Sequence, residues 1–505
     1  MALAGEGPAS ALDMAVAEEN ALALGHTLDE LMENAGRAIA EEAVRRLPKA
    51  PAKVAVLAGP GNNGGDGTCA AFYLAQWGYQ PEVWMVRPPA EIRSSAARRC
   101  YDRIASRLPV HAGVPRPAEL GGFPLVLDAL LGTGQAGPPR GAYRDAVAAA
   151  RESGAPILAV DAPTGLGSPE AIVPRWTVTL TAVKAGMTPA TAGEIVVREI
   201  GIPPAAQHET GPGEFHYYPK PRPATDRPRP GRVVVIGGGP YAGAPALAAL
   251  AALRSGVERA TVLVPLPAAD RVQSFSPDLV VHAVGEDRFH PADVPTIATF
   301  LESVSVDAVI VGMGVGRGES TLEAMRVLLP ELVGRYPTVV DADALDALPP
   351  ATPDAAPPTV ATPNQSEFAR VFGGDALGTP DERIEEVRRR ASTRRVTLLA
   401  KGEIDLISDG RRTALNRHHP PALAVSGTGD VLAGVVGGLL ARGVAGYAAA
   451  RLGTYWVGAA GYRAGARAGP GLVASDVVRE LGPALVAGLD RIGRRGEGLN
   501  APARR

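Results

Sequence analysis

The chain has 505 residues, which is too long for one ordinary domain. This length predicts two to four domains. Hydrophobic residues make up 46% of it and aromatic residues only 5%, so its cores must consist mainly of alanine, valine and leucine. A net charge of −2 argues against general nucleic-acid binding, and the lack of a long apolar run or a basic leader argues against membrane insertion and secretion.

Six short apolar runs divide the first half of the chain. Segments of helical length that end in glycine lie between them, such as residues 140–154. Continuous apolar runs are typical of parallel strands that are buried on both faces, so the pattern predicts a doubly wound α/β sheet. The predicted strands are 53–59, 81–87, 124–132, 156–163, 176–183 and 193–203.

A glycine-rich loop, GPGNNGGDG (59–67), follows the first predicted strand. Gly59, Gly61 and Gly64 satisfy the dinucleotide-binding pattern G-x-G-x-x-G. That pattern also requires an acidic residue about 20 positions later, at the end of the second strand, and Arg87 stands there instead. We therefore interpret the loop not as an NAD-binding fingerprint but as a turn at a helix N-terminus, whose backbone amides suit an anion.

Acidic residues end two further strands of this half. Asp128 follows one strand, and Asp161 follows the next within the sequence DAPTG, which also contains Thr164. Since the carboxyl ends of parallel strands meet in one crevice, Asn63, Asp128 and Thr164 could present several oxygen atoms to a hard cation. Each feature alone has an ordinary explanation as a tight turn or a helix cap, and their joint occurrence favours a site.

With these motifs, the first half resembles the YjeF N-terminal domain, an NAD(P)H-hydrate epimerase, over about residues 10–215. GPGNNGGDG is its most specific motif. The family usually shows D-[IV]-P-S-G, whereas this chain has Ala162 and Thr164, and threonine keeps the hydroxyl. The other matching motifs are LMENAG (31–36), LDALLGTG (127–134), DAPTG (161–165), TVTLTAVKAG (177–186) and EIVVREIGIP (194–203).

The resemblance implies roles for individual residues. It places a potassium ion on Asn63, Asp128 and Thr164, and it makes Asp161 the substrate-binding acid/base. Lys184 matches a frequent family lysine, for which a salt bridge and a catalytic role are both open. The residues that it implies as substrate contacts are Asn62, Asn63, Gly64, Gly65, Asp66, Gly132, Thr133, Gly134, Gln135, Ala136, Gly137, Pro138 and Asp161.

A proline-rich stretch of mixed charge, residues 217–231, separates the two halves and predicts an extended linker. The predicted organisation is a domain at 1–218, a linker at 219–230, a second α/β domain at 231–490 and a disordered tail at 491–505. The strands predicted in the second half are 232–239, 259–265, 307–314, 338–345, 359–364 and 396–402, with one more short strand after Gly402.

The sequence SGTGD (426–430) opens an apolar helix in the second half. The free amides and the positive dipole end of a helix N-terminus suit a phosphate, and Asp430 lies beside them. An acid at this position is also common for helix stability alone. Close approach of a phosphate would explain Gly427 and Gly429. Close helix packing is the better explanation for Gly434, Gly437 and Gly438.

Other strands of this half also end in polar residues, namely Asp341, Asp343, Asn364 and Lys401. Together with GGGPYAGAPALAALAALRSGVERATVLVP (237–265), they resemble the ribokinase-like superfamily and, within it, the NAD(P)H-hydrate dehydratase branch, over about residues 230–485. The family sequences often read T-P-H-P-G-E and G-G-T-G-D, where this chain has TPNQSE and Ser426.

In that branch, ADP phosphorylates the hydroxyl of the hydrate and phosphate then leaves. The resemblance implies Asp430 as the base and ADP as co-substrate with Mg²⁺. The residues that it implies for the nucleotide are Lys401, Gly402, Glu403, Ile404, Asp405, Gly427, Thr428 and Gly429. Those that it implies for the hydrate are Ala244, Gly316, Asn364 and Asp430.

The two resemblances together predict a bifunctional repair enzyme. One domain would interconvert the R and S epimers of NADHX and NADPHX, the hydrated cofactors, and the other would dehydrate the S epimer with ADP. The alternative is a ribokinase-like kinase of a hydroxymethylpyrimidine or a sugar, with a non-catalytic N-terminal binding module. Cys69 and Cys100 form no disulfide framework, so we expect a cytoplasmic location. We also expect the chain to form a homo-oligomer.

Overall fold

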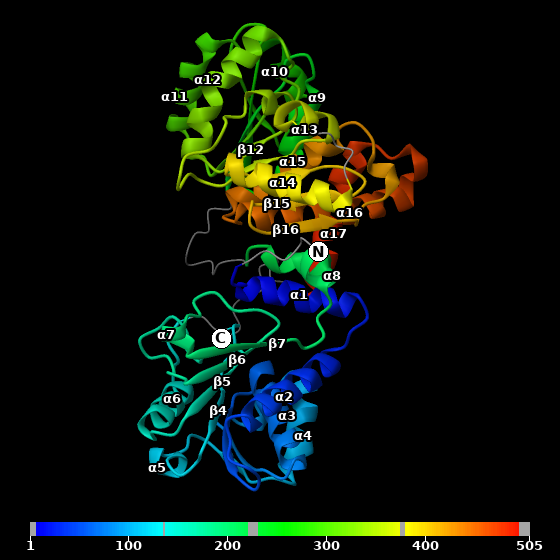
Figure 1. The fold of residues 1–505 in the computed structure, drawn as a ribbon. Coiled ribbons are helices and arrows are strands. Elements are labelled where there is room, and N and C mark those ends of the chain that lie inside the picture. The colour runs from blue at the N-terminus through cyan, green and yellow to red at the C-terminus, as the bar shows by residue number, and fades with distance from the viewer. Residues whose placement is uncertain (1–6, 135–136, 221–230, 374–378, 494–505) are drawn as a thin grey trace. The chain divides into compact units, whose positions relative to one another are not determined.

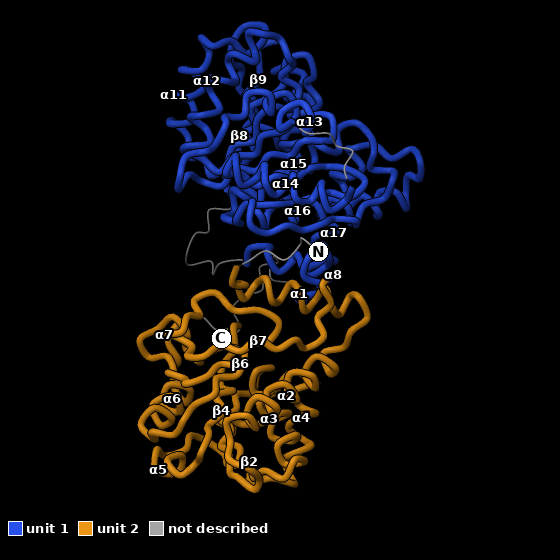
Figure 2. Tube along the Cα trace, viewed as in Figure 1, with its two compact units in different colours: residues 1–6, 205–505 blue, residues 7–204 orange. Residues whose placement is uncertain are grey.

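The computed structural model describes residues 7–134, 137–220, 231–373 and 379–493. The chain divides into two compact units, residues 7–204 and residues 205–505 together with 1–6, which Figure 2 distinguishes by colour. Both are α/β units with largely parallel sheets, as the apolar runs predict. None of the described helices combines the length and the apolar character that a membrane span needs.

The unit of residues 7–204 holds a seven-stranded parallel sheet in the order β3-β2-β1-β4-β5-β6-β7. Figure 1 labels its strands β4 to β7. This is the predicted Rossmann-like sheet. Its strands are β1 (Lys53–Ala58), β2 (Gln80–Met85), β3 (Val110–Ala112), β4 (Val126–Ala129), β5 (Ile157–Val160), β6 (Trp176–Leu180) and β7 (Glu194–Arg198). Its helices are α1 (Ala11–Ala23), α2 (Leu28–Val44), α3 (Asn62–Gln76), α4 (Ser95–Ala105), α5 (Pro117–Leu120), α6 (Ala142–Glu152) and α7 (Pro189–Ala192).

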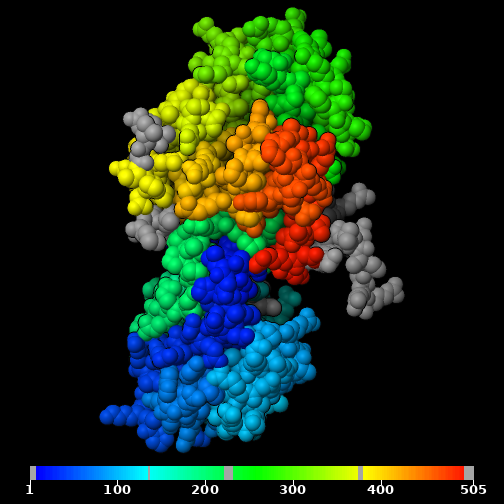
Figure 3. Space-filling view, turned by 90° about the vertical axis from the view of Figure 1, so that its right-hand side faces the viewer, coloured from blue at the N-terminus to red at the C-terminus, as the bar shows by residue number. Residues whose placement is uncertain are grey.

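Local signals in the sequence start the first helix and fix its place. Ser10 caps α1, because its hydroxyl accepts the Asp13 amide while the Asp13 carboxylate accepts the Ser10 amide at 2.9 Å. Just before this cap, the Ala9 amide donates to the Val183 carbonyl at 2.8 Å, and the Ala185 amide donates to the Ala9 carbonyl at 2.9 Å. These bonds tie α1, which lies at the surface of its unit (Figure 3), to the loop after β6.

The second unit holds a nine-stranded sheet in the order β10-β9-β8-β11-β12-β13-β14-β15-β16. The strands are parallel up to β14, and the last two pair antiparallel. They are β8 (Arg232–Ile236), β9 (Arg259–Val264), β10 (Val280–Ala283), β11 (Ala308–Val311), β12 (Thr338–Val340), β13 (Thr359–Ala361), β14 (Thr397–Ala400), β15 (Asp405–Ser408) and β16 (Thr413–Asn416).

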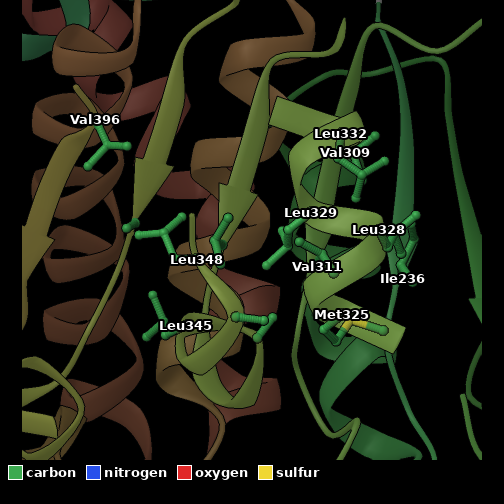
Figure 4. Close-up of a cluster of buried hydrophobic side chains, with 14 of the residues drawn as sticks. Ile236, Val309, Val311, Met325, Leu328, Leu329, Leu332, Leu345, Leu348 and Val396 are labelled. Carbon is green, nitrogen blue, oxygen red and sulfur yellow. The ribbon is translucent and has the colours of Figure 1, made fainter. Parts of the chain in front are cut away.

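Helices cover both faces of this sheet, which makes the expected ribokinase-like three-layer sandwich. On one face, α12 packs Met325 and Leu328 against Val309 and Val311 of the sheet (Figure 4). On the other face, α15 approaches Ile310. The helices are α8 (Pro204–His208), α9 (Gly243–Arg254), α10 (Leu266–Gln273), α11 (Val294–Ser303), α12 (Glu319–Arg335), α13 (Gln365–Phe372), α14 (Pro380–Arg394), α15 (Thr428–Ala441), α16 (Gly446–Ala468) and α17 (Ala474–Arg491).

The boundary between the units lies earlier than the predicted one at residue 218. Residues 205–218 pack with the second unit, because Glu214 and Arg451 form a fully buried bidentate ion pair at 2.6 and 3.1 Å. The Thr210 amide also donates to the Leu415 carbonyl at 2.8 Å. Leaving either charge of such a pair without its partner would be costly, so this segment belongs to the second unit.

Three strands, β3, β10 and β16, were absent from the strands that the sequence predicts by name. They lie at the edges of their sheets, and β3 and β10 are largely exposed. The predicted linker falls mainly on residues 221–230 and the predicted tail on 494–505, which lie outside the described residues, and α17 extends through Arg491. Cys69 and Cys100 are buried free thiols.

Candidate active sites

A cavity of about 620 Å³ opens in the first unit at the carboxyl ends of β1, β4 and β5. It brings together residues that the sequence places far apart. Seven of the predicted substrate contacts line it, namely Asn62, Asn63, Asp66, Gly132, Thr133, Gly134 and Asp161. Gly137 and Pro138 do not line it, and Gln135 and Ala136 lie outside the described residues.

The glycines that imitate a dinucleotide fingerprint are required for packing. A side chain at Gly59 would collide with the carbonyl of Leu130, and one at Gly64 would collide with the carbonyl of Gly59. At Gly65 it would stand 2.7 Å from the Cβ of Ala97 on α4. The loop and α3 therefore need these glycines to lie close to their neighbours. A contact of Gly64 or Gly65 with substrate stays a prediction.

Asp128 of β4 and Thr164, which follows β5, meet although they are 36 positions apart. The amide and hydroxyl of Thr164 donate to the Asp128 carboxylate at 2.9 and 2.7 Å. Burial raises the pKa of Asp128 to about 6, against the hydrogen bonds from Thr164, which lower it. The threonine that replaces the usual serine of the family thus keeps the hydroxyl in use.

Asn63 is the residue of this group that lacks partners. Its side chain is buried in the first turn of α3, and neither Oδ1 nor Nδ2 has a hydrogen-bond partner among the described residues. Such a group is costly to leave unsatisfied, so an amide at this position indicates a ligand. Its free oxygen, the Asp128 carboxylate and the Thr164 hydroxyl are all hard oxygen donors, which is the donor chemistry that alkali and alkaline-earth cations prefer.

Asp161 follows β5 in a left-handed backbone conformation, with φ of 62°. Aspartate tolerates this region better than most residues, and such strain is common at functional sites. Its carboxylate accepts a hydrogen bond from the buried Lys184 Nζ, which also donates to the Thr179 hydroxyl at 2.9 Å and the Leu180 carbonyl at 2.6 Å. Lys184 thus forms the ion pair that was one of its two expected roles, and a catalytic role for it stays untested.

Sequence reasoning missed another acidic group at this cavity, Glu18 of α1. Ala11, Met14, Ala15 and Glu18 line the cavity together, with the spacing of one helix face. Burial raises the pKa of Glu18 to about 7, and the nearby carboxylate of Asp161 adds to this rise, while Lys184 opposes it. The signal that could have revealed it is the single acid on an otherwise apolar stripe.

The second site forms where β12 and β14 end beside the start of α15. Lys401, just after β14, donates from Nζ to the Asp341 carboxylate at 2.9 Å. Burial alone would lower the pKa of Lys401, but attraction by Asp341, Glu367 and Asp430 outweighs it and raises this pKa. A built Cβ at Gly429 would stand 3.1 Å from Lys401 Nζ, so the ammonium lies at the N-terminus of α15.

Asp430 stands in the first turn of α15. Burial raises its pKa to about 7, the carboxylate of Asp341 adds to the rise, and Lys401 opposes it. Asp341 accepts a hydrogen bond from Lys401, whereas the Asp430 side chain has no hydrogen-bond or ion-pair partner among the described residues. A carboxyl with a pKa near neutrality beside a helix N-terminus and an ammonium can accept a proton while an anion binds next to it.

The packing role predicted for three glycines of α15 is confirmed, and a phosphate contact of Gly427 or Gly429 stays a prediction. Side chains at Gly434 and Gly438 would collide with the Ala248 carbonyl and the Ser255 hydroxyl, and one at Gly437 would collide with Ile310, so these three serve packing. Gly427 caps the helix with φ of 93°, a left-handed conformation that favours glycine.

The remaining predicted residues have structural partners of their own. Asn364 caps α13, because its Oδ1 accepts the Glu367 amide at 2.9 Å. Asp405 is buried and accepts hydrogen bonds from the Gly402 amide at 3.0 Å and from Asn416 at 2.9 Å. The Gly316 amide donates to Asp343 at 3.0 Å, and a built Cβ at Gly314 would stand 3.4 Å from that of Ala244. Contacts of these residues with a ligand stay predictions, as they do for Glu403, Ile404 and Thr428.

Comparison with known proteins agrees with the division into two units. A family model described as NAD(P)H-hydrate dehydratase matches residues 233–482, and one described as YjeF-related protein N-terminus matches residues 28–186. The bifunctional NAD(P)H-hydrate repair enzyme Nnr of Hyperthermus butylicus is 40% identical over 497 residues, which cover 94% of this chain and 92% of that protein.

This chain belongs to the bifunctional NAD(P)H-hydrate repair enzyme family. A second member, from Methanothermobacter thermautotrophicus, is 37% identical over 92% of this chain and 93% of its own length. Among solved structures, the ADP/ATP-dependent NAD(P)H-hydrate dehydratase from Bacillus subtilis, co-crystallised with ATP and Mg²⁺, covers 55% of this repair-family chain at 22% identity, with a TM-score of 0.48.

Proposed function

We propose that the chain repairs hydrated nicotinamide cofactors with two active sites. The first unit epimerises NADHX and NADPHX, and the second dehydrates the S epimer to NADH or NADPH at the expense of ADP. The observation that carries the proposal is Asp430, a carboxyl with a pKa of about 7 beside Lys401 and a helix N-terminus, in a chain whose family performs this repair.

In the second unit, the chemistry needed is the conversion of a poor leaving group into a good one. Asp430 accepts the proton of the hydrate hydroxyl as its oxygen attacks the β-phosphorus of ADP, and AMP departs. Loss of phosphate from the product then regenerates the ring double bond. Lys401 and the amides of Gly427–Gly429 would hold the phosphates, and Mg²⁺ would arrive with them.

In the first unit, the cavity of about 620 Å³ would hold the hydrated nicotinamide half of the dinucleotide. Asp161, held by Lys184, is placed to exchange a proton with the oxygen on the reacting carbon. Asn63, Asp128 and Thr164 would hold a potassium ion, whose charge would favour the anionic substrate in the cavity. The unpartnered, buried oxygen of Asn63 supports this assignment.

The proposal is tested by incubating the full chain with (S)-NADHX and following the return of NADH absorbance. We expect return with ADP and Mg²⁺ and none without nucleotide, together with AMP and phosphate in equal amounts. The Asp430→Asn variant serves as the inactive control for this assay. Absence of ADP- or ATP-dependent return would contradict the dehydratase assignment, and phosphorylation of a hydroxymethylpyrimidine or a sugar would favour the kinase alternative.

A further inference from the structure

The epimers differ at the ring carbon that carries the hydroxyl, next to the ring nitrogen. One route to inversion lets the hydroxyl leave from one face of the ring and water return to the other. Hydroxide leaves poorly, so the departing oxygen needs a proton, and the returning water must lose one. A single carboxyl on one side of the ring does not serve both faces, so the reaction calls for a second proton-transfer group.

Four carboxyl groups line the first cavity, and their surroundings distinguish them. Glu91 forms an exposed ion pair with Arg87. Asp161, at the end of β5, is ion-paired with Lys184. Asp66, near the start of α3, has a pKa raised well above its usual value by burial and by the charges of Asp161 and Glu18. Glu18 has no hydrogen-bond or ion-pair partner among the described residues.

The position of Glu18 is fixed independently of any ligand. It comes from α1, whereas Asp161 comes from the end of β5, so the two acids enter the cavity from different elements. The capped start of α1 is hydrogen-bonded to the loop that carries Lys184. The same arrangement that holds Lys184 against Asp161 therefore also holds the helix of Glu18.

We propose that Glu18 is the second proton-transfer residue of the epimerisation, working with Asp161 across the bound ring. This rests on the proposed function of the first unit. Starting from one epimer, the Glu18 carboxyl gives its proton to the hydroxyl, the carbon–oxygen bond breaks and water leaves. The electron pair of the ring nitrogen stabilises the resulting cation.

Water then adds to the opposite face, a new carbon–oxygen bond forms, and Asp161 takes the proton that this water loses. Glu18 ends as carboxylate and Asp161 as carboxylic acid, so atoms and charge balance, and the other epimer reacts with the roles exchanged. A pKa of about 7 suits this exchange, since an acid with a pKa near the working pH both gives and regains its proton.

The test compares Glu18→Gln with Glu19→Gln, a change of the same kind one position along α1, in the full chain. Conversion of (R)-NADHX is measured by coupling to the chain's own ADP-dependent dehydration, with the uncatalysed rate subtracted. We expect Glu18→Gln to lower kcat by about 100-fold or more with KM little changed, and Glu19→Gln to stay within a few-fold of wild type. Glu18→Asp, which keeps the acid, should recover part of the rate.

The pH profile of kcat adds a readout that a merely structural residue would not move. The charged groups around Glu18 are Asp161, Lys184 and Asp66, with Glu91 and Arg93 also at the cavity. The wild type should show an inflection near pH 7 that Glu18→Gln lacks.

Two failures are distinguishable. If the wild type does not convert (R)-NADHX faster than the uncatalysed reaction, the epimerase function itself is contradicted. If the wild type converts it and Glu18→Gln retains the rate and the inflection, the function stands and the role of Glu18 is overturned. It is also overturned if Glu18→Gln loses activity only together with its melting temperature and Glu18→Asp recovers neither.

Discussion

The two sheets share one strand order but use it differently. Counted from the first strand of each, both run 3-2-1-4-5-6-7, and the second adds two antiparallel strands. In the first unit, the cavity lies at the carboxyl ends of the neighbouring strands β1 and β4, where the strand order reverses and open parallel sheets usually bind ligands. In the second, Lys401 and Asp430 lie at β14 and α15, farther along the sheet. A shared topology therefore does not decide where the chemistry occurs.

The electrostatic arrangement of the two sites is more alike than their positions. In each, a lysine pairs with one carboxylate after a strand, Lys184 with Asp161 and Lys401 with Asp341. In each, a second carboxyl nearby has its pKa raised to about 7, chiefly by burial. The lysine forms an ion pair with one acid, and burial raises the pKa of the other toward neutral pH.

The largest effect that separates the sites should come from Asp430→Asn. The amide keeps the shape of the side chain but cannot accept the hydroxyl proton, so ADP-dependent dehydration should fall by about 10²- to 10⁴-fold. Conversion between R- and S-NADHX, followed by chromatography, should be unchanged. A loss of epimerisation in this variant would show that the two sites are not independent.

Lys401→Gln should have the next largest effect, on the same reaction. We expect the KM for ADP to rise about tenfold, because one charge-assisted phosphate contact is lost. Lys401 lowers the pKa of Asp430, so its removal raises that pKa. The base works as the carboxylate, so wild-type activity should fall as the pH drops through about 7. In the variant this fall should occur at a higher pH. An unmoved profile would remove Asp430 as the titrating base.

Asn63→Ala tests the cation assignment in the first unit. With one of the three oxygen donors removed, the stimulation of epimerisation by K⁺ over Li⁺ should shrink several-fold, while dehydration keeps its rate. The matched change is Asn62→Ala, since Asn62 lines the same cavity but is exposed and is not one of those donors. Equal K⁺ stimulation in the wild type and Asn63→Ala would contradict a cation at this position.

The smallest effect compares two glycines of α15 by stability. Gly438→Ala should lower the free energy of unfolding of the second unit by about 1–3 kcal/mol, because the new methyl meets the Ser255 hydroxyl. Gly429→Ala meets only the flexible end of Lys401, so it should leave stability nearly unchanged and weaken ADP binding instead. Denaturant unfolding and ADP titration of both variants check this, and equal destabilisation would contradict the division into packing and site glycines.

The sequence reveals the strands that lie inside the sheets because these are continuous apolar runs. It misses β3 and β10, which are short edge strands with exposed faces. The domain boundary is missed for a different reason. Glu214 and Arg451 are 237 positions apart, and nothing local in the sequence shows that they pair. The homo-oligomeric state and the cytoplasmic location remain predictions.

For the sites, the sequence supplies residues that belong to recognisable motifs, and the fold supplies their partners. The sequence identifies both Asp161 and Lys184, but their ion pair is visible only once the loop after β6 is folded. Glu18 escaped because an acid in a helix is unremarkable until the packing of α1 places it at the cavity. Burial and neighbouring charges, which set its proton affinity, are properties of the folded chain.

The most direct measurement gives the full chain a mixture of R- and S-NADHX with excess ADP and Mg²⁺ and follows the recovery of NADH. Two independent sites predict complete recovery at enzymatic rates in the wild type. Asp161→Asn should recover the S fraction at the wild-type rate, then the R fraction at the uncatalysed rate, and Asp430→Asn should recover almost nothing. Recovery of only the S fraction by the wild type would contradict the account, as would rapid and complete recovery by Asp161→Asn.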